Sequence, residues 1–387
     1  MDELAALNNA HATYDDLLVY GDPVPPLNFP EPELHPAARV SATLFHREEN
    51  RLFEAPNVVY RDGDEVPHFA YWIQRKLKKA IYGCVRSCML LKLCQDMPYQ
   101  TDPSTGRRNI IWEITGKFVA VKIMDWDLIR KLSGVHKEEP LKEIAAMQSL
   151  RNTLDACPHV MPTLDVMTDQ QYLYSFMPYC SGGELFSYVQ RDGRFPEPLA
   201  RFWFRQLVQG IFHLQKAGIC HRDMSLENVL VDGNNAVVID LGMCLRIPFS
   251  DDDTGGVTDV TAYTLRRLMP PQGQCGKPNY MSPEVLENSE PFDGFGVDVW
   301  AVGIILFTML VGLPPWDWAT KEDLRFKMIA IDGQLGEMLR QWGRSVSPLA
   351  TDLLQGILRA HPRDRLTFGQ IMDHEWVIHP EISSPEP

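Results

Sequence analysis

Residues 221–228 read His-Arg-Asp-Met-Ser-Leu-Glu-Asn, and Asp240-Leu241-Gly242 begins 12 residues after Asn228. The second block directly follows an apolar run, so its carboxylate is expected where a strand ends. Phosphoryl transfer needs one carboxylate to orient the hydroxyl nucleophile, further oxygen ligands for Mg²⁺, and a lysine on the phosphates. The order and spacing of Asp223, Asn228 and Asp240 therefore indicate that kind of chemistry.

Other short motifs occur in the order found in protein kinases. Val119-Ala120-Val121-Lys122 resembles the lysine motif of that family, and Glu143 stands where the helical partner of this lysine is expected. Residues 282–284, 298–303 and 362–367 resemble later motifs of that family. The resemblance implies that an arginine of the last motif pairs with Glu284. The chain from about 79 to 378 thus resembles the protein kinase superfamily. The sequences of its motifs most resemble those of the serine/threonine kinases of the calmodulin-dependent and cyclic-nucleotide-dependent groups.

The resemblance implies a fold and a reaction. The fold would be the α+β, two-lobed kinase fold, with a small β-rich N-lobe and hinge over 80–179 and a larger helical C-lobe over 180–378. The reaction would be ATP- and Mg²⁺-dependent transfer of the γ-phosphate to serine or threonine hydroxyls of protein substrates. A small-molecule phosphotransferase is disfavoured, because the blocks at 282–284, 298–303 and 362–367 build a peptide-docking lobe in this family.

The resemblance also implies roles for individual residues. Asp223 would accept or orient the proton of the substrate hydroxyl, and Lys122, oriented by Glu143, would hold the α- and β-phosphates. Asn228 and Asp240 would hold Mg²⁺. The remaining nucleotide contacts would come from Gly83, Val85, Met177, Pro178, Cys180, Glu184 and Glu227.

The glycine-rich loop of the family is degraded in this chain. Its candidate is residues 83–90, where Gly83 alone remains of the G-x-G-x-x-G pattern and Val85 and Cys88 take the other places. Glycines allow the backbone to approach phosphates closely, so the sequence predicts a weak phosphate cradle. A pseudokinase, which keeps the fold as a binding or scaffold module, is therefore the alternative function.

Two positions of the catalytic region are exchanged relative to serine/threonine kinases, which usually have lysine at 225 and threonine at 277. Here Ser225 and Lys277 occupy them. The two side chains approach each other in the family, so we expect Lys277 to supply the cation beside Asp223 and Ser225 the hydroxyl. At about 4 Å and an effective dielectric near 20, a lysine–aspartate contact contributes roughly 4 kcal/mol before desolvation. The alternative is that Lys277 points to solvent and Ser225 reflects lost function.

Residues 240–284 correspond to the activation segment of the family. The position of the usual phosphothreonine aligns near Gly273, which has no hydroxyl. Arg222 would usually meet that phosphate. Three alternatives follow: the acidic triplet 251–253 replaces the phosphate, another threonine is used, or activity needs no phosphorylation. The candidate threonines are Thr258, Thr261 and Thr264.

The N-terminal region differs in composition from the rest of the chain. Residues 1–65 hold 13 acidic and 4 basic residues, and six prolines fall between 23 and 36. Such a segment is expected to be extended or disordered, as a linker or tail, with a docking role for partners as the alternative. Residues 66–79 show helical spacing and basic charge, which predicts an amphipathic helix that packs on its own domain or binds an acidic partner. Residues 379–387 are expected to be a short tail.

Charge and cysteine content bound the partners and the location. A net charge of -14 disfavours non-specific nucleic-acid binding. The eight cysteines lack any C-x-x-C pair and are expected to be reduced thiols, which favours a cytoplasmic location without excluding the nucleus.

The apolar run 299–313 is shorter than the roughly 20 residues of a membrane span, which predicts a buried core helix and no transmembrane segment. Glu184 and Glu227 align with carboxylates that receive arginine in basophilic kinases, which predicts basic peptide substrates.

Overall fold

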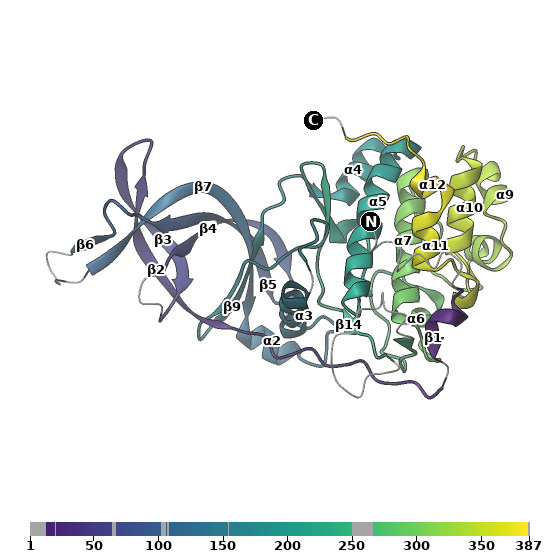
Figure 1. Ribbon diagram of the computed structural model, residues 1–387, viewed down its shortest axis with the longest axis horizontal. Coiled ribbons are helices and arrows are strands. Elements are labelled where there is room, and N and C mark those ends of the chain that lie inside the picture. Colours follow the sequence, from purple (N-terminus) through teal and green to yellow (C-terminus); the bar gives the residue numbers. More distant parts are fainter. Residues whose placement is uncertain are drawn as a thin grey trace. The chain divides into compact units, whose positions relative to one another are not determined.

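The computed structural model describes residues 13–19, 21–63, 67–101, 106, 108–153, 155–249 and 266–385. The chain forms two compact units. The first, here called the β-rich unit, comprises Glu31–Gln148 and Pro162–Tyr179. The second, the helical unit, comprises Met1–Pro30, Ser149–Met161 and Cys180–Pro387. This division into one β-rich and one helical unit confirms the expected α+β, two-lobed class (Figure 1).

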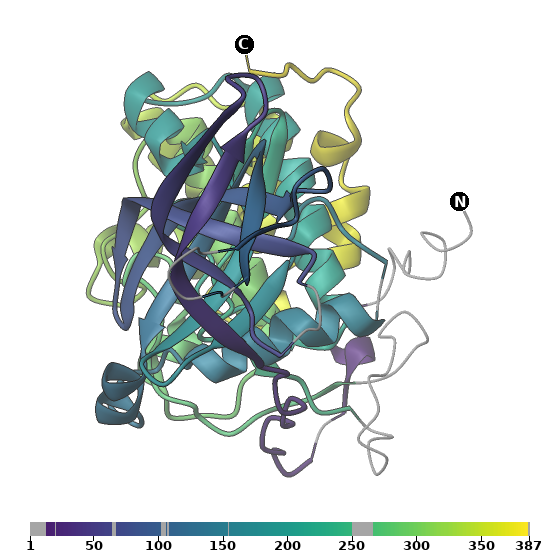
Figure 2. The same ribbon diagram turned by 90° about the vertical axis from the view of Figure 1, so that its left-hand side faces the viewer.

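Eight strands within the described part of the β-rich unit form one sheet, in the order β5-β4-β3-β2-β8-β9-β7-β6. Strand β7 also pairs with β5 and β2, so the sheet closes on itself. Figure 2 shows this sheet, with β2 and β3 in purple. Two helices follow β7, and α3 runs on into the helical unit. The bounds are β2 His35–His46, β3 Arg51–Arg61, β4 Phe69–Ala80, β5 Gly83–Leu93, β6 Tyr99–Thr101, β7 Arg108–Asp125, α2 Trp126–Leu132, α3 Pro140–Thr153, β8 Asp165–Thr168 and β9 Tyr172–Pro178.

The expectation of an extended or disordered segment over 1–65 is wrong for most of residues 35–61, which form the antiparallel β2–β3 hairpin. Leu44 and Val58 are fully buried in one core cluster with Trp112. Val59 is buried in a second cluster. Composition averages over the segment, so it cannot register that its apolar side chains fall at core-facing positions of two strands.

The amphipathic helix expected over 66–79 is also wrong, because Phe69–Ala80 is strand β4. Tyr71 and Ile73 pair with residues of β5 and are buried. Phe69 and Leu77, which belong to the proposed helical stripe, are instead 57% and 38% exposed. Aromatic and β-branched residues favour strands where a sheet offers them neighbours, and pairing with β5 supplies those neighbours here.

The helical unit is built around α7, Gly294–Val311, all of whose residues are buried. It begins at Asp293, whose carboxylate accepts hydrogen bonds from the Phe295 and Gly296 N–H groups, and it ends at Gly312 in a left-handed conformation. Among the described helices it is the one long and apolar enough to span a membrane, and it is entirely enclosed by protein. The prediction of a buried core helix is therefore confirmed.

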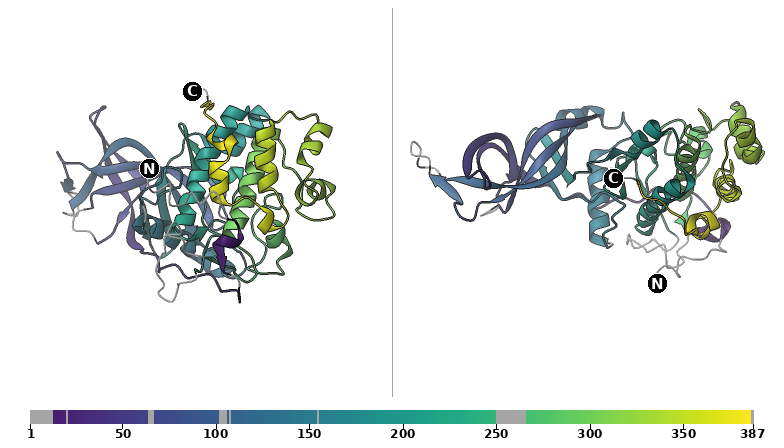
Figure 3. Two further views of the ribbon diagram at one scale, coloured as in Figure 1. Left: turned by 45° about the vertical axis from the view of Figure 1, so that its right-hand side comes forward. Right: turned by 90° about the horizontal axis from the view of Figure 1, so that it is seen from above.

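Further helices surround α7 (Figure 3), with α5 and α10 packed against it. The described strands of the helical unit form three small sheets, β1-β15, β10-β12-β13 and β11-β14. The helices are α4 Leu185–Asp192, α5 Glu197–Lys216, α6 Pro283–Glu287, α8 Leu324–Phe326, α9 Leu335–Gln341, α10 Pro348–Ile357, α11 Phe368–Asp373 and α12 Glu375–Ile378, with single turns η1 Asp15–Leu17, η2 Leu226–Asn228, η4 Lys327–Ile331 and η5 Pro362–Asp364. The strands are β1 Leu18–Val19, β10 Gly183–Glu184, β11 Ile219–Cys220, β12 Val229–Asp232, β13 Asn235–Val238, β14 Leu245–Arg246 and β15 Arg266–Arg267.

Candidate active site

Strand β7 presents the predicted lysine on one face of the β-rich sheet. Val119, Val121 and Ile123 belong to one core cluster, so Lys122 between them points to the opposite face. There its Nζ donates to Glu143 Oε2 over 2.7 Å. Both side chains are buried. The predicted lysine–glutamate pair is therefore formed within this unit.

The same lysine has a second carboxylate partner that the sequence analysis missed. Its Nζ lies 3.2 Å from Glu138 Oε1, in the turn before α3. The Tyr82 hydroxyl donates to the Glu138 carbonyl over 2.5 Å, which ties this turn to the β4–β5 connection. The sequence signal for this contact was the Glu138-Glu139 pair just before the start of α3. Acidic residues are common at helix N-termini because the helix dipole stabilises them there, so the pair did not indicate a lysine partner.

The candidate glycine-rich loop is not a loop in the structure. Residues 83–90 lie inside strand β5, with Val85 opposite Lys122 and Cys88 opposite Val119. The turn falls earlier, at Ile81 and Tyr82. Gly83 is required because a Cβ there would collide with the Ile123 carbonyl of β7. The sequence analysis therefore placed the first glycine of the loop pattern at Gly83, which is already the first residue of strand β5.

The predicted adenine-binding residues lie at the end of β9 and just beyond it. Met177 pairs with Ala120 and Pro178 with Val119. Because side chains alternate along a strand, Met177 shares its face of the sheet with Ala120, Lys122 and Val85. Cys180 is the first residue of the helical unit after this strand.

In the helical unit, the loop that carries Asp223 is fastened to the core helix. Asp298 of α7 accepts hydrogen bonds from the His221 N–H at 2.7 Å and from the Arg222 N–H at 2.9 Å. Its side chain is fully buried, and this burial raises its pKa to about 6. The His221 ring nitrogens contact the Asp223 N–H and the Ile239 carbonyl. Asp298 was known from the sequence as a motif residue, but its anchoring contact was not predicted.

Asp223 and Asn228 form the core of this loop. The Asn228 Nδ2 group donates to the Asp223 carbonyl at 2.7 Å and to Asp223 Oδ2 at 3.0 Å. Burial raises the pKa of Asp223 and Asp240 adds to this rise, whereas His221 and Lys277 counteract it electrostatically. The two catalytic-loop residues predicted from the sequence are therefore brought together.

The exchanged pair is also brought together. Lys277 Nζ donates to Ser225 Oγ over 2.6 Å and forms an ion pair with Glu227 Oε2 at 3.3 Å. Lys277 is thus not directed only to solvent, and its charge is shared with Glu227. Glu184, the other predicted acidic residue, lies at the start of α4 and pairs with Leu230 of β12.

The Arg222 guanidinium contacts backbone carbonyls, whereas the resemblance to kinases implied that it would contact the phosphate of a phosphothreonine. Its guanidinium donates to the Gly273 carbonyl at 3.2 Å and to the Met243 carbonyl at 3.4 Å. The acidic triplet 251–253 and the candidate threonines Thr258, Thr261 and Thr264 lie outside the described residues. Arg222 and Asp240 both have left-handed backbones, with φ of 66° and 70°. Such strain in non-glycine residues is typical of functional sites.

One long-range pair expected from the motifs is confirmed. Arg365 Nη1 and Nη2 donate to the two Glu284 carboxylate oxygens, each at 2.7 Å. Arg365 also donates to the Gly296 carbonyl and stacks on Trp300. This buried bidentate pair fixes the end of the activation segment on α7.

The oxygen donors in the helical unit suit a hard divalent cation. Asp240 offers a carboxylate, and Asn228 offers its amide Oδ1 because its Nδ2 group is engaged by Asp223. Mg²⁺ prefers such oxygen ligands. The predicted ligand pair therefore fits Mg²⁺ in donor chemistry.

Comparison with known proteins agrees with this arrangement. The family described as protein kinase domain matches residues 108–377. The chain is 31% identical over 264 residues to CBL-interacting serine/threonine-protein kinase 16 of Arabidopsis thaliana, which covers 68% of this chain and 51% of that protein. It is 33% identical over 263 residues to CBL-interacting protein kinase 1 of Oryza sativa subsp. japonica, covering 68% and 50%.

A yeast relative, the fatty acyl-CoA synthetase and RNA processing-associated kinase 1 of Saccharomyces cerevisiae, is 28% identical over 263 residues, covering 67% of this chain and 28% of that protein. The chain thus spans about half the length of the two plant relatives. Strands β2 to β6 precede the residues that the family matches.

Proposed function

Because the chain belongs to the protein kinase family, we propose that it transfers the γ-phosphate of ATP to serine or threonine hydroxyls of protein substrates. The observation that carries the proposal is the half-buried Asp223, held by Asn228 and influenced by the Lys277 charge. The naming of the two plant relatives as a serine/threonine-protein kinase and a protein kinase supports the same reaction.

In this mechanism, Asp223 orients the acceptor hydroxyl and takes its proton as the hydroxyl oxygen bonds to the γ-phosphorus of ATP, while the bond from that phosphorus to the β–γ bridging oxygen breaks and ADP leaves. Burial raises the pKa of Asp223, and the charges of His221 and Lys277 act in the opposite direction and favour its carboxylate form. Ser225 holds the Lys277 ammonium in place. General-base assistance contributes about 10²–10⁴ in rate, and the rest comes from positioning and charge neutralisation.

Lys122 supplies the positive charge for the α- and β-phosphates. Glu143 fixes the direction of its ammonium group, at 2.7 Å. Asp240 and Asn228 would hold Mg²⁺, which supplies positive charge against the negative charge of the phosphates when bound. Val85 and Met177 lie on the same face of the sheet as Lys122 and would contact the adenosine.

A basic-directed substrate preference, for which Glu184 and Glu227 are the candidate carboxylates, is also proposed. The Lys277 ion pair already compensates the charge of Glu227. A substrate arginine would have to compete with that intrachain cation. We further propose a cytoplasmic location, which the eight free cysteines favour.

The pseudokinase alternative has one specific observation in its favour. The β4–β5 turn at Ile81 and Tyr82 contains no glycine, and Tyr82 is buried against Glu138 instead of exposing backbone to a phosphate. An enzyme with this turn would hold phosphates less closely. A module that binds ATP without transferring phosphate is therefore the second candidate.

The test is transfer of labelled γ-phosphate from Mg-ATP to a panel of serine and threonine peptides, basic and neutral. Asp223→Asn serves as the control, because it keeps the shape of the loop and removes the base. Transfer that disappears in this variant supports the kinase. Thermal stabilisation by Mg-ATP without any transfer in the wild-type protein supports the pseudokinase.

A further inference from the structure

The N-terminal segment pairs with the activation segment on both sides of residues 250–265. Strand β1 pairs in parallel with β15, with Leu18 opposite Arg266. The Val24 N–H donates to the Leu268 carbonyl and the Leu27 N–H to the Arg246 carbonyl, each at 2.9 Å. All of these residues belong to the helical unit. Residues 14–28, here called the N-terminal brace, thus contact the chain before and after residues 250–265.

The proline pattern of the brace agrees with these hydrogen bonds. In Pro23-Val24-Pro25-Pro26-Leu27, only the second and fifth residues have a backbone N–H. Both of these groups donate to the activation segment. Prolines also reduce the conformational freedom that the segment loses when it docks. In a plain linker, the two remaining N–H groups of this stretch, those of Val24 and Leu27, would not be expected both to donate to the activation segment.

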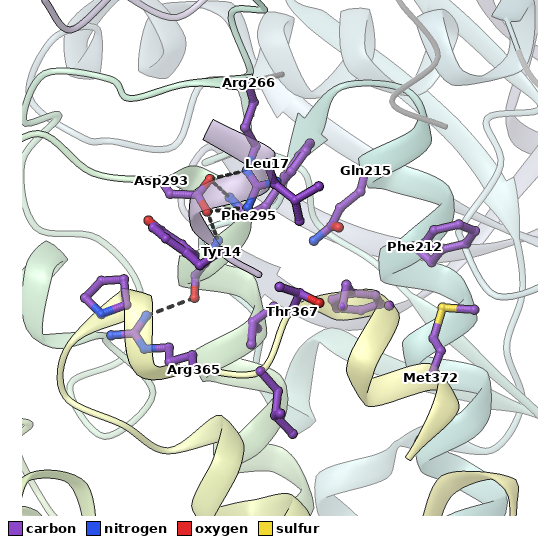
Figure 4. Close-up of a pocket in the computed structure, with 16 residues that line it drawn as sticks. Tyr14, Leu17, Phe212, Gln215, Arg266, Asp293, Phe295, Arg365, Thr367 and Met372 are labelled. Carbon is purple, nitrogen blue, oxygen red and sulfur yellow. Dashed lines mark hydrogen bonds and ion pairs between the residues drawn. The ribbon is translucent and has the colours of Figure 1, made fainter. Parts of the chain in front are cut away.

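Tyr14 anchors the start of the brace. It is 9% exposed, and the Arg266 guanidinium lies over its ring at 6.0 Å. Arg266 in turn makes a bidentate pair with Asp293, the residue that caps α7, at 2.8 and 2.7 Å. Figure 4 shows Tyr14 and Leu17 beside this pair, at the edge of a cavity of about 100 Å³. The Asp15 carboxylate lies 3.6 Å from Arg363.

Between the residues that the brace contacts and the catalytic loop, a series of separate hydrogen bonds holds residues 269–277. Met269 exchanges two backbone hydrogen bonds with Phe292, each at 2.9 Å. The Gly273 N–H donates to Asn288 Oδ1 at 2.7 Å, and its carbonyl accepts from Arg222. Four residues further, Lys277 reaches Ser225. The position of Lys277 therefore depends on a stretch whose first residues are held by the brace.

We propose that the N-terminal brace is a positioning element that holds the activation segment, and with it Lys277, in place without a phosphate at position 273. Gly273 has no hydroxyl, and Arg222 is bonded to carbonyls. The brace thus supplies in cis the order that a phosphate–arginine contact would otherwise supply. The catalytic part of this inference rests on the proposed kinase function.

The test uses full-length variants that remove single N–H donors. Val24→Pro and Leu27→Pro each remove one hydrogen bond to the activation segment. Glu31→Pro is the matched control, because Glu31 also stands between two prolines and is exposed. Leu27→Ile keeps the N–H and controls for the side chain. Amide hydrogen exchange of residues 266–277, kcat and the KM for ATP are measured for each.

One lost hydrogen bond corresponds to about a fivefold change. We expect exchange over 266–269 to be about fivefold faster in each proline variant, with kcat reduced several-fold and the KM for ATP within twofold of wild type. The Glu31→Pro and Leu27→Ile proteins should match wild type. Unchanged exchange and kcat in the Val24→Pro, Leu27→Pro double variant would overturn the proposal.

A phosphatase treatment tests the second half of the inference. Fully dephosphorylated wild-type protein should keep its kcat, and a loss of activity on dephosphorylation would overturn independence from phosphate. If the wild-type protein transfers no phosphate at all, the proposed function fails. Hydrogen exchange still decides whether the brace orders residues 266–277, so the two failures are distinguishable.

Discussion

Lys277 and Ser225 are in direct contact: the lysine ammonium donates to the serine hydroxyl over 2.6 Å. The two residues are 52 positions apart, and they are the pair for which the resemblance to kinases implies a lysine and a hydroxyl residue in the reverse order. A cation and a hydroxyl are therefore both still present, with their places in the chain reversed. The same lysine lowers the pKa of Asp223 against the effect of burial.

We predict that Lys277→Thr reduces kcat by about 10–100-fold, since general-base assistance contributes about 10²–10⁴ and the variant impairs it without removing the base. The acid limb of the pH–rate profile should move to higher pH. The limb moves to higher pH because loss of the nearby cation disfavours the Asp223 carboxylate and raises its pKa further. Initial rates between pH 5 and 9 measure both effects, with the exposed Lys321→Thr as control.

The double variant Ser225→Lys, Lys277→Thr should recover most of the activity that each single variant loses. It restores the usual order of the two residue types around Asp223. Double-mutant analysis of kcat/KM gives the coupling between the two positions. A double variant as inactive as the worse single variant would show that the exchange is not compensatory.

The two carboxylates on Lys122 should behave differently. Glu143→Gln is expected to lower kcat/KM for ATP by about 10²-fold, in line with losing a charge-assisted hydrogen bond of about 1.5–3 kcal/mol that orients the lysine. Glu138→Gln should lower the KM for ATP or leave it unchanged, because it removes a negative charge that competes with phosphate for the ammonium. Steady-state kinetics over an ATP series separate the two. Equal losses in both variants would show that the lysine needs both partners.

Asp298 should make the stability of the protein depend on pH. Its pKa of about 6 in the folded state lies above the unfolded value near 4. The folded state therefore holds the proton more tightly. Stability from this group is fully present below about pH 4 and is lost as pH rises to about 6. The loss is on the order of 2–3 kcal/mol.

Asp298→Asn should remove this pH dependence and lower stability near neutral pH. The His221 N–H donates to Asp298 Oδ2 and the Arg222 N–H to Oδ1, so an asparagine would set its NH2 group, which is a donor only, against one of these two N–H groups. Urea unfolding at pH 4, 5, 6 and 7 measures the slope. Asp293→Asn, at another buried carboxylate, tests whether the effect is particular to Asp298.

Much of the helical unit could be predicted from the sequence because its functional contacts belong to short motifs. The Glu284–Arg365 pair and the approach of Lys277 to Ser225 are examples, as is the buried α7. Each of these follows from residue types at positions that a family pattern defines.

The β-rich unit was harder to predict because its strands depend on partners far away in the sequence. Segment 66–79 carries a helical spacing of apolar residues, and only its pairing with β5 makes it a strand. The brace contacts residues more than 200 positions away, which no local pattern records. Glu138 was missed for a related reason: its role depends on where the turn before α3 places it against Lys122.

The last prediction concerns the corrected position of the β4–β5 turn. If residues 83–90 were a degraded glycine-rich loop, Cys88→Gly would improve it and lower the KM for ATP. In the structure Cys88 is fully buried in a strand opposite Val119. Its removal should therefore cost roughly 1.5–3 kcal/mol, from lost apolar burial and the entropy of a glycine in a strand.

Ala80→Gly is the matched comparison, because Ala80 is the last residue of β4 before the turn at Ile81 and Tyr82. It should cost about 0.5–1 kcal/mol, mainly from backbone entropy. Denaturant unfolding and the KM for ATP are measured on both variants. A Cys88→Gly protein with wild-type stability and a lower KM for ATP would favour the loop over the strand. We expect the opposite result, in which Cys88→Gly is the less stable of the two variants and its KM for ATP is not lowered. That result would favour phosphate contact at the turn that Ala80 precedes.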